Sequence, residues 1–138
     1  MKRFISIAAL AAVLGVSGCG VFSEINDERY SRNNAKGREW LSDQTMPADI
    51  NIGGNWHSGD WGYASFSQDG RRVTGNLGNY AVKGVVSGNK AYLVASQDGW
   101  DYYSVILERD GEYSLKGRYS RSIPYQKWNR GDFRLERR

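Results

Sequence analysis

Few residues in this chain carry the chemistry of common catalytic sites. His57 is the only histidine, and its imidazole is a candidate general base. The chain has no second histidine to complete a metal site and no Gly-x-Ser-x-Gly segment of the kind that presents a nucleophilic serine. We therefore expect His57 to be a surface residue near a strand end, and we predict no catalytic residue, metal site or cofactor.

The aspartates considered for a paired-acid or calcium site occur in or beside predicted turns. Aspartate favours turns because its side chain hydrogen-bonds to nearby backbone. This role accounts for them, so neither a glycosidase pair nor a calcium loop is predicted. The residues concerned are Asp60, Asp69, Asp98, Asp101 and Asp110.

The N-terminal segment has the order of a secretory signal. Lys2 and Arg3 supply the positive start, and residues 4–16 are almost entirely apolar. This apolar run is too short to span a bilayer stably, because a transmembrane helix needs roughly 20 such residues. It ends in Val16-Ser17-Gly18-Cys19, which contains the only cysteine.

Those four residues resemble the lipobox of bacterial lipoproteins. The resemblance implies that residues 1–18 are a signal peptide and that Cys19 becomes the lipidated N-terminus, with a covalent lipid as its only attached group. Lipoproteins with aspartate after the cysteine tend to remain in the inner membrane, and Gly20 stands there instead. The resemblance thus implies an anchor in the outer membrane with the protein facing the periplasm, or in the cell membrane if the organism has only one.

Composition favours one small β domain after the signal. Of the 138 residues, 120 remain after residue 18, enough for one core and too few for two. Loss of Lys2 and Arg3 lowers the net charge from +4 to +2, and nucleic acid is not an expected partner outside the cytoplasm. The 17 glycines, nine tyrosines and five tryptophans with only two prolines favour strands joined by tight turns.

Polarity divides the chain at about Asn51. Residues 19–51 lack sustained periodicity and are predicted to be a polar tether, with a short helix between Ser23 and Tyr30. Trp40 and Leu41 are its apolar exceptions and are expected to dock on the domain. The domain itself is predicted to span residues 52–138.

Eight short alternating runs follow, separated by turn residues such as Asp69-Gly70, Asp98-Gly99 and Asp110-Gly111. Each turn joins neighbouring strands, so the predicted topology is an antiparallel up-and-down meander. The runs are Gly54–Ser58, Tyr63–Gln68, Arg72–Leu77, Tyr80–Ser87, Lys90–Ser96, Tyr102–Glu108, Tyr113–Ser120 and Asp132–Arg137.

One face of these runs is apolar and the other is polar. A sheet with one apolar face must bury it, and eight meandering strands can do so by closing into a barrel. The fold class predicted is therefore all-β, an eight-stranded antiparallel barrel preceded by a signal peptide and a tether. The predicted inner face consists of Phe66, Val73, Leu77, Val82, Val86, Leu93, Val105, Leu107, Leu115, Phe133 and Leu135.

Gly54-Asn55-Trp56 resembles the Gly-x-Trp element that opens the lipocalins and related calycin barrels, which include avidin-like proteins. The resemblance covers residues 52–138, although the later lipocalin motifs are missing. It implies that Trp56 packs across the closed end of the barrel near a basic residue of the last strand, either Arg134 or Arg137.

Aromatic and basic residues supply the candidate binding surfaces. Rigid amphipathic rings in loops often anchor ligands or partner proteins, although they also plug the ends of small barrels. From residue 113 onward, eight basic residues face only Asp132 and Glu136, a surplus that suits anionic headgroups, an acidic partner or simply solvent. The aromatic candidates are Trp61, Trp100, Tyr102, Tyr103, Tyr125 and Trp128.

Three hypotheses of function follow. The leading one is a lipid-anchored, non-enzymatic module that binds a small hydrophobic ligand or an envelope protein. The second is an inhibitor of a hydrolase that attacks the envelope, such as a lysozyme or a protease. The third is an enzyme built around His57, which predicts that His57→Ala abolishes activity but not folding.

Overall fold

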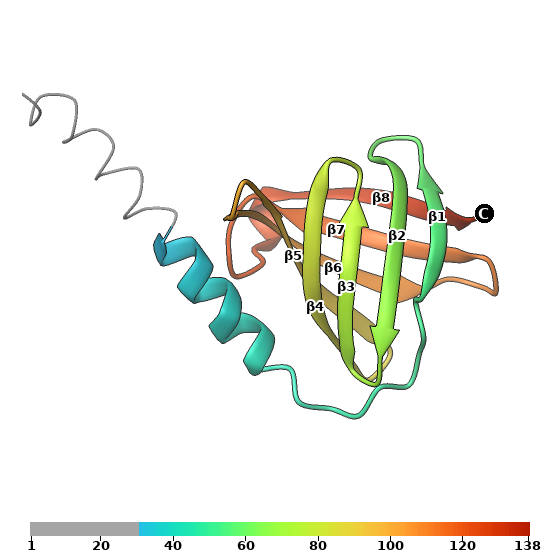
Figure 1. The fold of residues 1–138 in the computed structure, drawn as a ribbon, viewed down its shortest axis with the longest axis horizontal. Coiled ribbons are helices and arrows are strands. Elements are labelled where there is room, and N and C mark those ends of the chain that lie inside the picture. The colour runs from blue at the N-terminus through green and yellow to red at the C-terminus, as the bar shows by residue number, and fades with distance from the viewer. Residues whose placement is uncertain (1–30) are drawn as a thin grey trace, which may run out of the picture. The chain divides into compact units, whose positions relative to one another are not determined.

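Tight turns and alternating apolar residues produce eight strands in the computed structural model, which describes residues 31–138 (Figure 1). A 3-10 helix, η1 (Lys127–Asn129), lies in the last connection. The lipobox and the helix predicted between Ser23 and Tyr30 lie outside the described residues. The strands are β1 (Gly54–Ser58), β2 (Gly62–Asp69), β3 (Arg72–Leu77), β4 (Tyr80–Ser87), β5 (Lys90–Gln97), β6 (Trp100–Arg109), β7 (Ser114–Ser120) and β8 (Arg130–Arg137).

Each strand pairs with the next in antiparallel register, and β1 pairs with β8 to close the barrel. The predicted fold class is confirmed, and each strand end lies within two residues of its predicted position. One irregularity is a shift between Ala95 and Ser96, where Ser96 pairs with Asp101 and Ala95 with Tyr103. This register shift is a β-bulge, which inserts one extra residue of β6 at this point.

Side chains from all eight strands fill the barrel. Every residue predicted for the inner face is buried, and Trp56, at 0% exposure, is the largest fully buried side chain. Two glycines create room for larger neighbours. Gly117 is paired with Phe133, and a Cβ on Gly117 would lie 2.3 Å from the Phe133 ring; at Gly84 a Cβ would lie 2.0 Å from the Tyr92 carbonyl oxygen.

A segment before β1, residues 44–52, closes one end of the barrel. It bonds to the β4–β5 turn through Asp49 N–H to the Gly88 carbonyl at 2.8 Å and Gly88 N–H to the Pro47 carbonyl at 2.9 Å. The amide of Gln68 also binds this segment, since its oxygen accepts from Ile52 N–H and its nitrogen donates to the Ile50 carbonyl, both at 2.9 Å. Residues 44–52 therefore belong to the barrel structure rather than to a free spacer.

The helix over residues 31–42 was not anticipated by the sequence. Within the compact unit of residues 33–138, the Asn34 side chain accepts from Asp101 N–H at 2.8 Å and donates to the Gly99 carbonyl at 2.9 Å. Trp40 packs edge-on against Tyr92 with ring centres 5.7 Å apart, in agreement with its predicted docking role. The helix thus covers part of the outer face of β5, where Val94 is fully buried.

Candidate functional site

An aromatic cluster fills the end of the barrel opposite residues 44–52. Trp61, in the β1–β2 connection, is its centre, with ring centres 5.5 Å from Tyr103 and 5.2 Å from Tyr119 in edge-to-face geometry. Tyr80 and Phe133 each lie 5.7 Å from the same indole. Such pairs stabilise beyond the area that they bury. Trp61 and Tyr103, two of the sequence candidates for binding, are thus part of the packing at this end.

Burial raises the pKa of Tyr80 in this cluster, and its hydrogen bond to Tyr103 adds to the rise. The Tyr80 phenol therefore stays protonated across the physiological range and acts as a hydrogen-bonding group.

The other aromatic candidates differ in exposure. Tyr102 is half-buried and its ring centre lies 6.4 Å from that of Tyr80. Trp100 is also half-buried at the start of β6. Tyr125 is half-buried, and its hydroxyl has no hydrogen-bond partner among the described residues. Trp128, in η1, is 80% exposed and is the candidate most available to a partner.

His57 and four of the five aspartates occupy positions that agree with their expected roles. His57 is exposed on β1, and its ring centre lies 5.5 Å from that of Tyr63. Asp60, Asp69, Asp98 and Asp110 are exposed in or beside turns.

Asp101 differs from the other aspartates, because its side chain is only 1% exposed. It was expected to act as a turn residue, yet it lies in β6 beneath the helix. Its carboxylate accepts no hydrogen bond from the described residues and has Lys83 Nζ at 3.8 Å. Burial raises the pKa of Asp101, while the charges of Lys83 and Arg38 oppose the rise.

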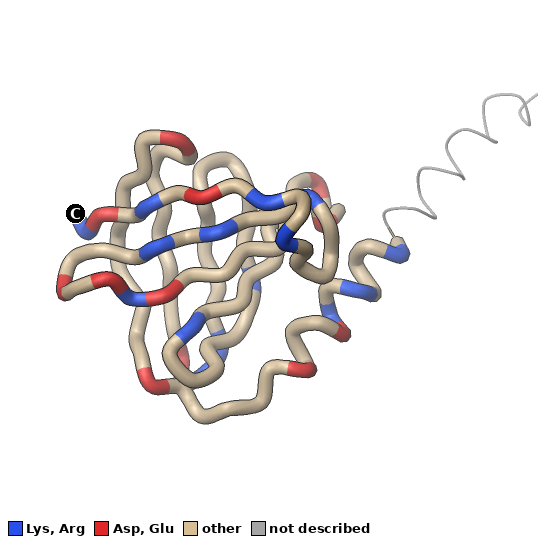
Figure 2. The backbone as a smooth tube through the Cα atoms, turned by 180° about the vertical axis from the view of Figure 1, so that it is seen from behind, with Lys and Arg blue, Asp and Glu red and all other residues tan. Residues whose placement is uncertain are grey.

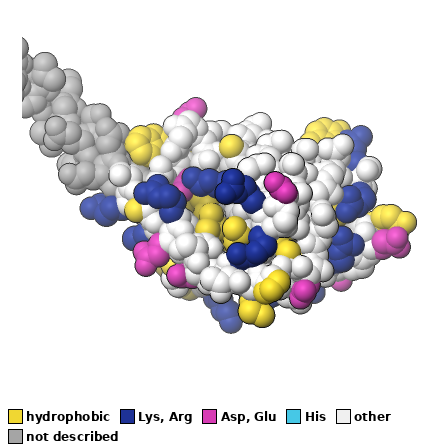
Figure 3. All heavy atoms as spheres, turned by 60° about the horizontal axis from the view of Figure 1, so that its bottom comes forward, with side chains coloured by type: hydrophobic (Ala, Val, Ile, Leu, Met, Phe, Trp, Pro, Cys, Tyr) yellow, Lys and Arg dark blue, Asp and Glu magenta, His cyan; other side chains and the backbone are white. Residues whose placement is uncertain are grey.

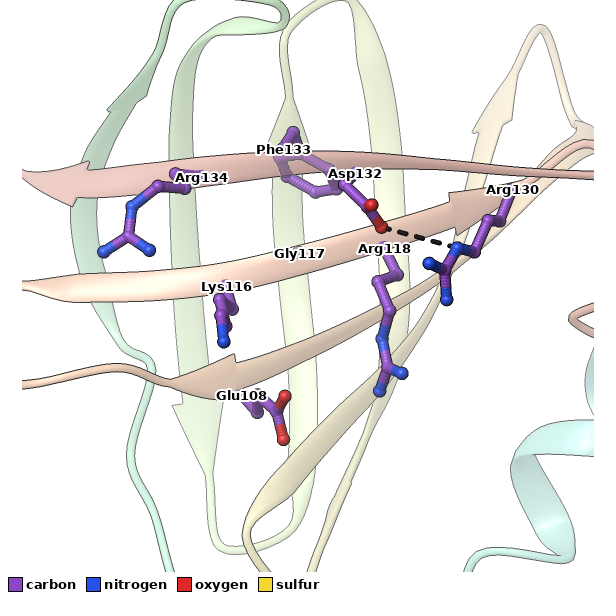
Figure 4. A pocket seen from close by; sticks show the side chains of 8 residues that line it. All are labelled: Glu108, Lys116, Gly117, Arg118, Arg130, Asp132, Phe133 and Arg134. Atoms are coloured by element: carbon purple, nitrogen blue, oxygen red, sulfur yellow. Dashed lines mark ion pairs between the residues drawn. The ribbon is translucent and has the colours of Figure 1, made fainter. Parts of the chain in front are cut away.

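The outer face of β6, β7 and β8 carries a groove of about 460 Å³, here called the basic groove (Figure 4). This volume is in the range of small-ligand sites. Four cationic side chains and two carboxylates border it, and the close-up shows Lys116 and Arg118 extending to the same side of β7. The lining residues are Glu108, Lys116, Gly117, Arg118, Arg130, Asp132, Phe133 and Arg134.

Strand register explains how these residues meet. In the strand ladders, Lys116 lies opposite Glu108 of β6 on one side and Arg134 of β8 on the other, and Arg118 lies opposite Asp132 of β8. Side chains two residues apart on a strand project from the same face. The central strand therefore contributes only positive charge to the groove, while the carboxylates come from the flanking strands.

Two of the four groove cations are already held by carboxylates. Arg134 donates to Asp110 at 2.6 Å and to the Ser114 hydroxyl at 2.8 Å, and its Nε lies 3.5 Å from Glu136. The contacts with Asp110 and then Glu136 raise the pKa of Arg134, which remains charged. Arg130 Nε lies 3.8 Å from Asp132. Within residues 31–138, neither Lys116 nor Arg118 is within ion-pair distance of a carboxylate.

The basic residues of the C-terminal sequence therefore do not form one surface: some line the basic groove and others lie over aromatic rings. Figure 2 shows successive basic positions along two neighbouring strands of the barrel. Arg137 lies instead over Trp56, and Arg138 lies with its guanidinium carbon 4.5 Å from the Tyr63 ring centre. A separate hollow is lined by Asp69, Arg71, Arg72 and Val85. Figure 3 brings the lower side of Figure 1 forward and shows basic side chains around a hollow on that side too.

Sequence reasoning recognised the basic surplus but not the groove. The signal that could have located it is the Lys116-Gly117-Arg118 alternation on one strand, read together with the neighbouring Arg130, Asp132 and Arg134. Locating the groove also required the register between β7 and β8, which the sequence does not specify because a long connection joins these two strands.

Among the described residues, no helix has the length and apolarity needed to cross a membrane. Residues 31–138 contain no group of three or more histidine, cysteine, aspartate or glutamate side chains arranged to hold a metal ion. No protein-family model, curated protein or solved structure matches this chain.

Proposed function

We propose that this protein is a lipid-anchored binding module of the bacterial cell envelope, which acts without catalysis and holds an acidic ligand or partner in the basic groove. The observation that carries the binding role is the pair Lys116 and Arg118, whose side chains line the groove and lie beyond ion-pair distance of the carboxylates of the described residues. Unpaired cations that converge on a concave surface attract anions more strongly than scattered surface charges do.

The sequence supports the proposed location. The lipobox ending in Cys19 supports a lipid anchor, and Gly20 after it supports the outer membrane with the barrel on the periplasmic side. The Gly54-Asn55-Trp56 element supports kinship with the calycin barrels, and the contact of Trp56 with Arg137 of β8 fits that kinship. In this proposal the binding site is on the outer face, because the interior of the barrel is occupied by buried side chains.

The binding role can be tested with the full-length protein in neutral detergent and fluorescent polyglutamate as an acidic probe. Lys116→Glu/Arg118→Glu is compared with Lys36→Glu/Arg72→Glu, which makes the same charge change at exposed positions outside the groove. The groove variant should raise the Kd at least about tenfold, and the control variant less than about threefold. Equal weakening by both variants would mean that only the net charge matters and would refute the site.

A second candidate function, inhibition of an envelope-attacking hydrolase, is favoured by the exposure of Trp128. An exposed tryptophan commonly anchors a protein interface, and Trp128 lies two residues before Arg130 of the groove. Inhibition of a lysozyme and of a metalloprotease should then fall at least about tenfold in Trp128→Ala. Tyr113→Ala, which removes an aromatic ring that is 63% exposed in the β6–β7 connection, is the matched control.

A further inference from the structure

The basic groove has a charge arrangement that selects among anions. Its lining contains four cations and two carboxylates, so the surplus of two positive charges is neutralised by one dianion. The carboxylates lie on β6 and β8, whereas β7 presents only Lys116 and Arg118. An anion is therefore favoured above β7 and toward β8, where Arg130 and Arg134 outnumber Asp132, and disfavoured toward β6, which contributes only Glu108.

The two cations on β7 offer complementary donors. Lys116 and Arg118 flank Gly117 and project from one face, roughly 7 Å apart at their Cα atoms. Arg118 presents a planar fork of N–H groups that matches two oxygens of one anion, and Lys116 presents a compact charge with three donors. Since neither side chain has an ion pair or hydrogen bond among the described residues, both can turn to a ligand without breaking such an interaction there.

The flanking arginines are held in place around this pair. Arg134 is fixed by Asp110, Ser114 and Glu136, and Arg130 lies beside Asp132. Their positions leave the centre of the groove open while maintaining positive charge at its border (Figure 4). This division separates cations that shape the groove from cations that are free to bind.

We propose that the basic groove binds a phosphate group, with Lys116 and Arg118 as its donors. This inference rests on the proposed function and narrows its ligand. A phosphate monoester carries nearly two negative charges and three exposed oxygens, so it can accept from the Arg118 fork and from Lys116 together. A single carboxylate has one charge and two oxygens, and the Arg118 fork alone would satisfy it. The phosphate can belong to a soluble compound or to a lipid headgroup.

The test uses the full-length protein in neutral detergent, with inorganic pyrophosphate as the soluble probe and succinate as its dicarboxylate counterpart. Binding is followed by calorimetry and by the NMR signal of the Arg118 Nε–H. Pyrophosphate should bind at least about tenfold more tightly than succinate and should shift that signal. A third arm replaces part of the detergent with phosphatidic acid, whose headgroup is a phosphate monoester, and phosphatidylcholine is its zwitterionic control.

The variant Lys116→Gln/Arg118→Gln should raise the Kd for pyrophosphate at least about tenfold, while Lys36→Gln/Arg72→Gln should change it less than about twofold. A response to pyrophosphate alone supports a soluble phosphate ligand, and a groove-dependent response to phosphatidic acid supports a lipid headgroup. Equal affinity for succinate and pyrophosphate, or binding that the groove variant retains, overturns the proposal. Groove-dependent binding of polyglutamate without phosphate binding would reject this inference and leave the proposed function standing.

Discussion

The guanidinium carbon of Arg137 lies 4.2 Å from the centre of the Trp56 ring. The same guanidinium donates to the Gly53 carbonyl at 3.1 Å, and the Trp56 indole donates to the Ile52 carbonyl at 2.9 Å. The last strand is thereby joined to the residues that enter β1. The register between β1 and β8 comprises only two residue pairs, so these side-chain contacts reinforce the seam where the barrel closes.

Replacing Arg137 should weaken this seam. Arg137→Ala should lower the free energy of unfolding by about 1–2 kcal/mol, because it removes a cation–π contact over a desolvated ring and one hydrogen bond. Arg137→Lys should recover only part of the loss, since an ammonium lacks the planar face. Urea denaturation measures the effect, and Arg72→Ala, an exposed cation on β3, should stay within about 0.5 kcal/mol of the parent. An Arg137→Ala protein as stable as that control would contradict the assigned contact.

Asp101 should make stability depend on pH. Because burial raises its pKa in the folded protein, the folded state holds the proton more tightly than the unfolded chain does. This contribution is fully present below the ordinary aspartate pKa of about 3.9 and is lost as the pH rises through the raised value. Asp101→Asn should therefore be more stable than the parent at neutral pH and should lose that advantage in acid. Denaturation midpoints across the acid range measure this, with Asp98→Asn in the exposed turn as the control.

The ion pair of Asp101 with Lys83 provides an independent check. Lys83→Gln should destabilise the parent at neutral pH by about 1 kcal/mol or less, because the lysine is half exposed and solvent screens its charge. In the Asp101→Asn background the same substitution should have almost no effect, which a double-mutant cycle will show. An equal cost in both backgrounds would mean that Lys83 acts through other contacts.

Gly117 should not tolerate a side chain while Phe133 is opposite. Gly117→Ala places a methyl group 2.3 Å from the Phe133 ring and should cost about 1–3 kcal/mol through overpacking. Phe133→Leu in the same chain should recover part of that loss, because the smaller side chain makes room. Gly84→Ala is the comparison, since its new methyl group meets the backbone oxygen of Tyr92, which no side-chain substitution can remove. Thermal unfolding of the single and double variants separates these cases.

Cys19→Ser tests the anchor separately from the barrel. The variant should lose metabolic labelling by palmitate and its association with membranes, because serine offers no thiol for the lipid. Circular dichroism of the purified variant should still show the β-barrel, since residue 19 lies before the compact unit of residues 33–138. Lipid labelling that persists in Cys19→Ser would reject the lipobox interpretation.

Much of the barrel could be predicted from the sequence, because its information is local. Asp-Gly turns permit the tight reversals between strands, and alternation with period two assigns Phe66, Val73 and Leu93 to one face without knowledge of their partners. The same local pattern predicted that the sheet closes into a barrel, since the apolar face of an eight-stranded meander has to be buried. The helix over residues 31–42 escaped prediction because its stability depends on contacts with Gly99, Asp101 and Tyr92, which are distant in the chain.

The strand order, the inner face and the excess of positive charge near the C-terminus could all be predicted from local sequence patterns. The contacts of each charged or aromatic residue could not, because they depend on register and on neighbours from other strands. Register placed Arg137 over Trp56 and left Lys116 and Arg118 facing a groove. Trp61 and Tyr103 pack together at one end of the barrel, and Asp101 is buried beneath the helix. Residues of the same type thus acquired different roles, since burial and pairing are properties of the folded chain.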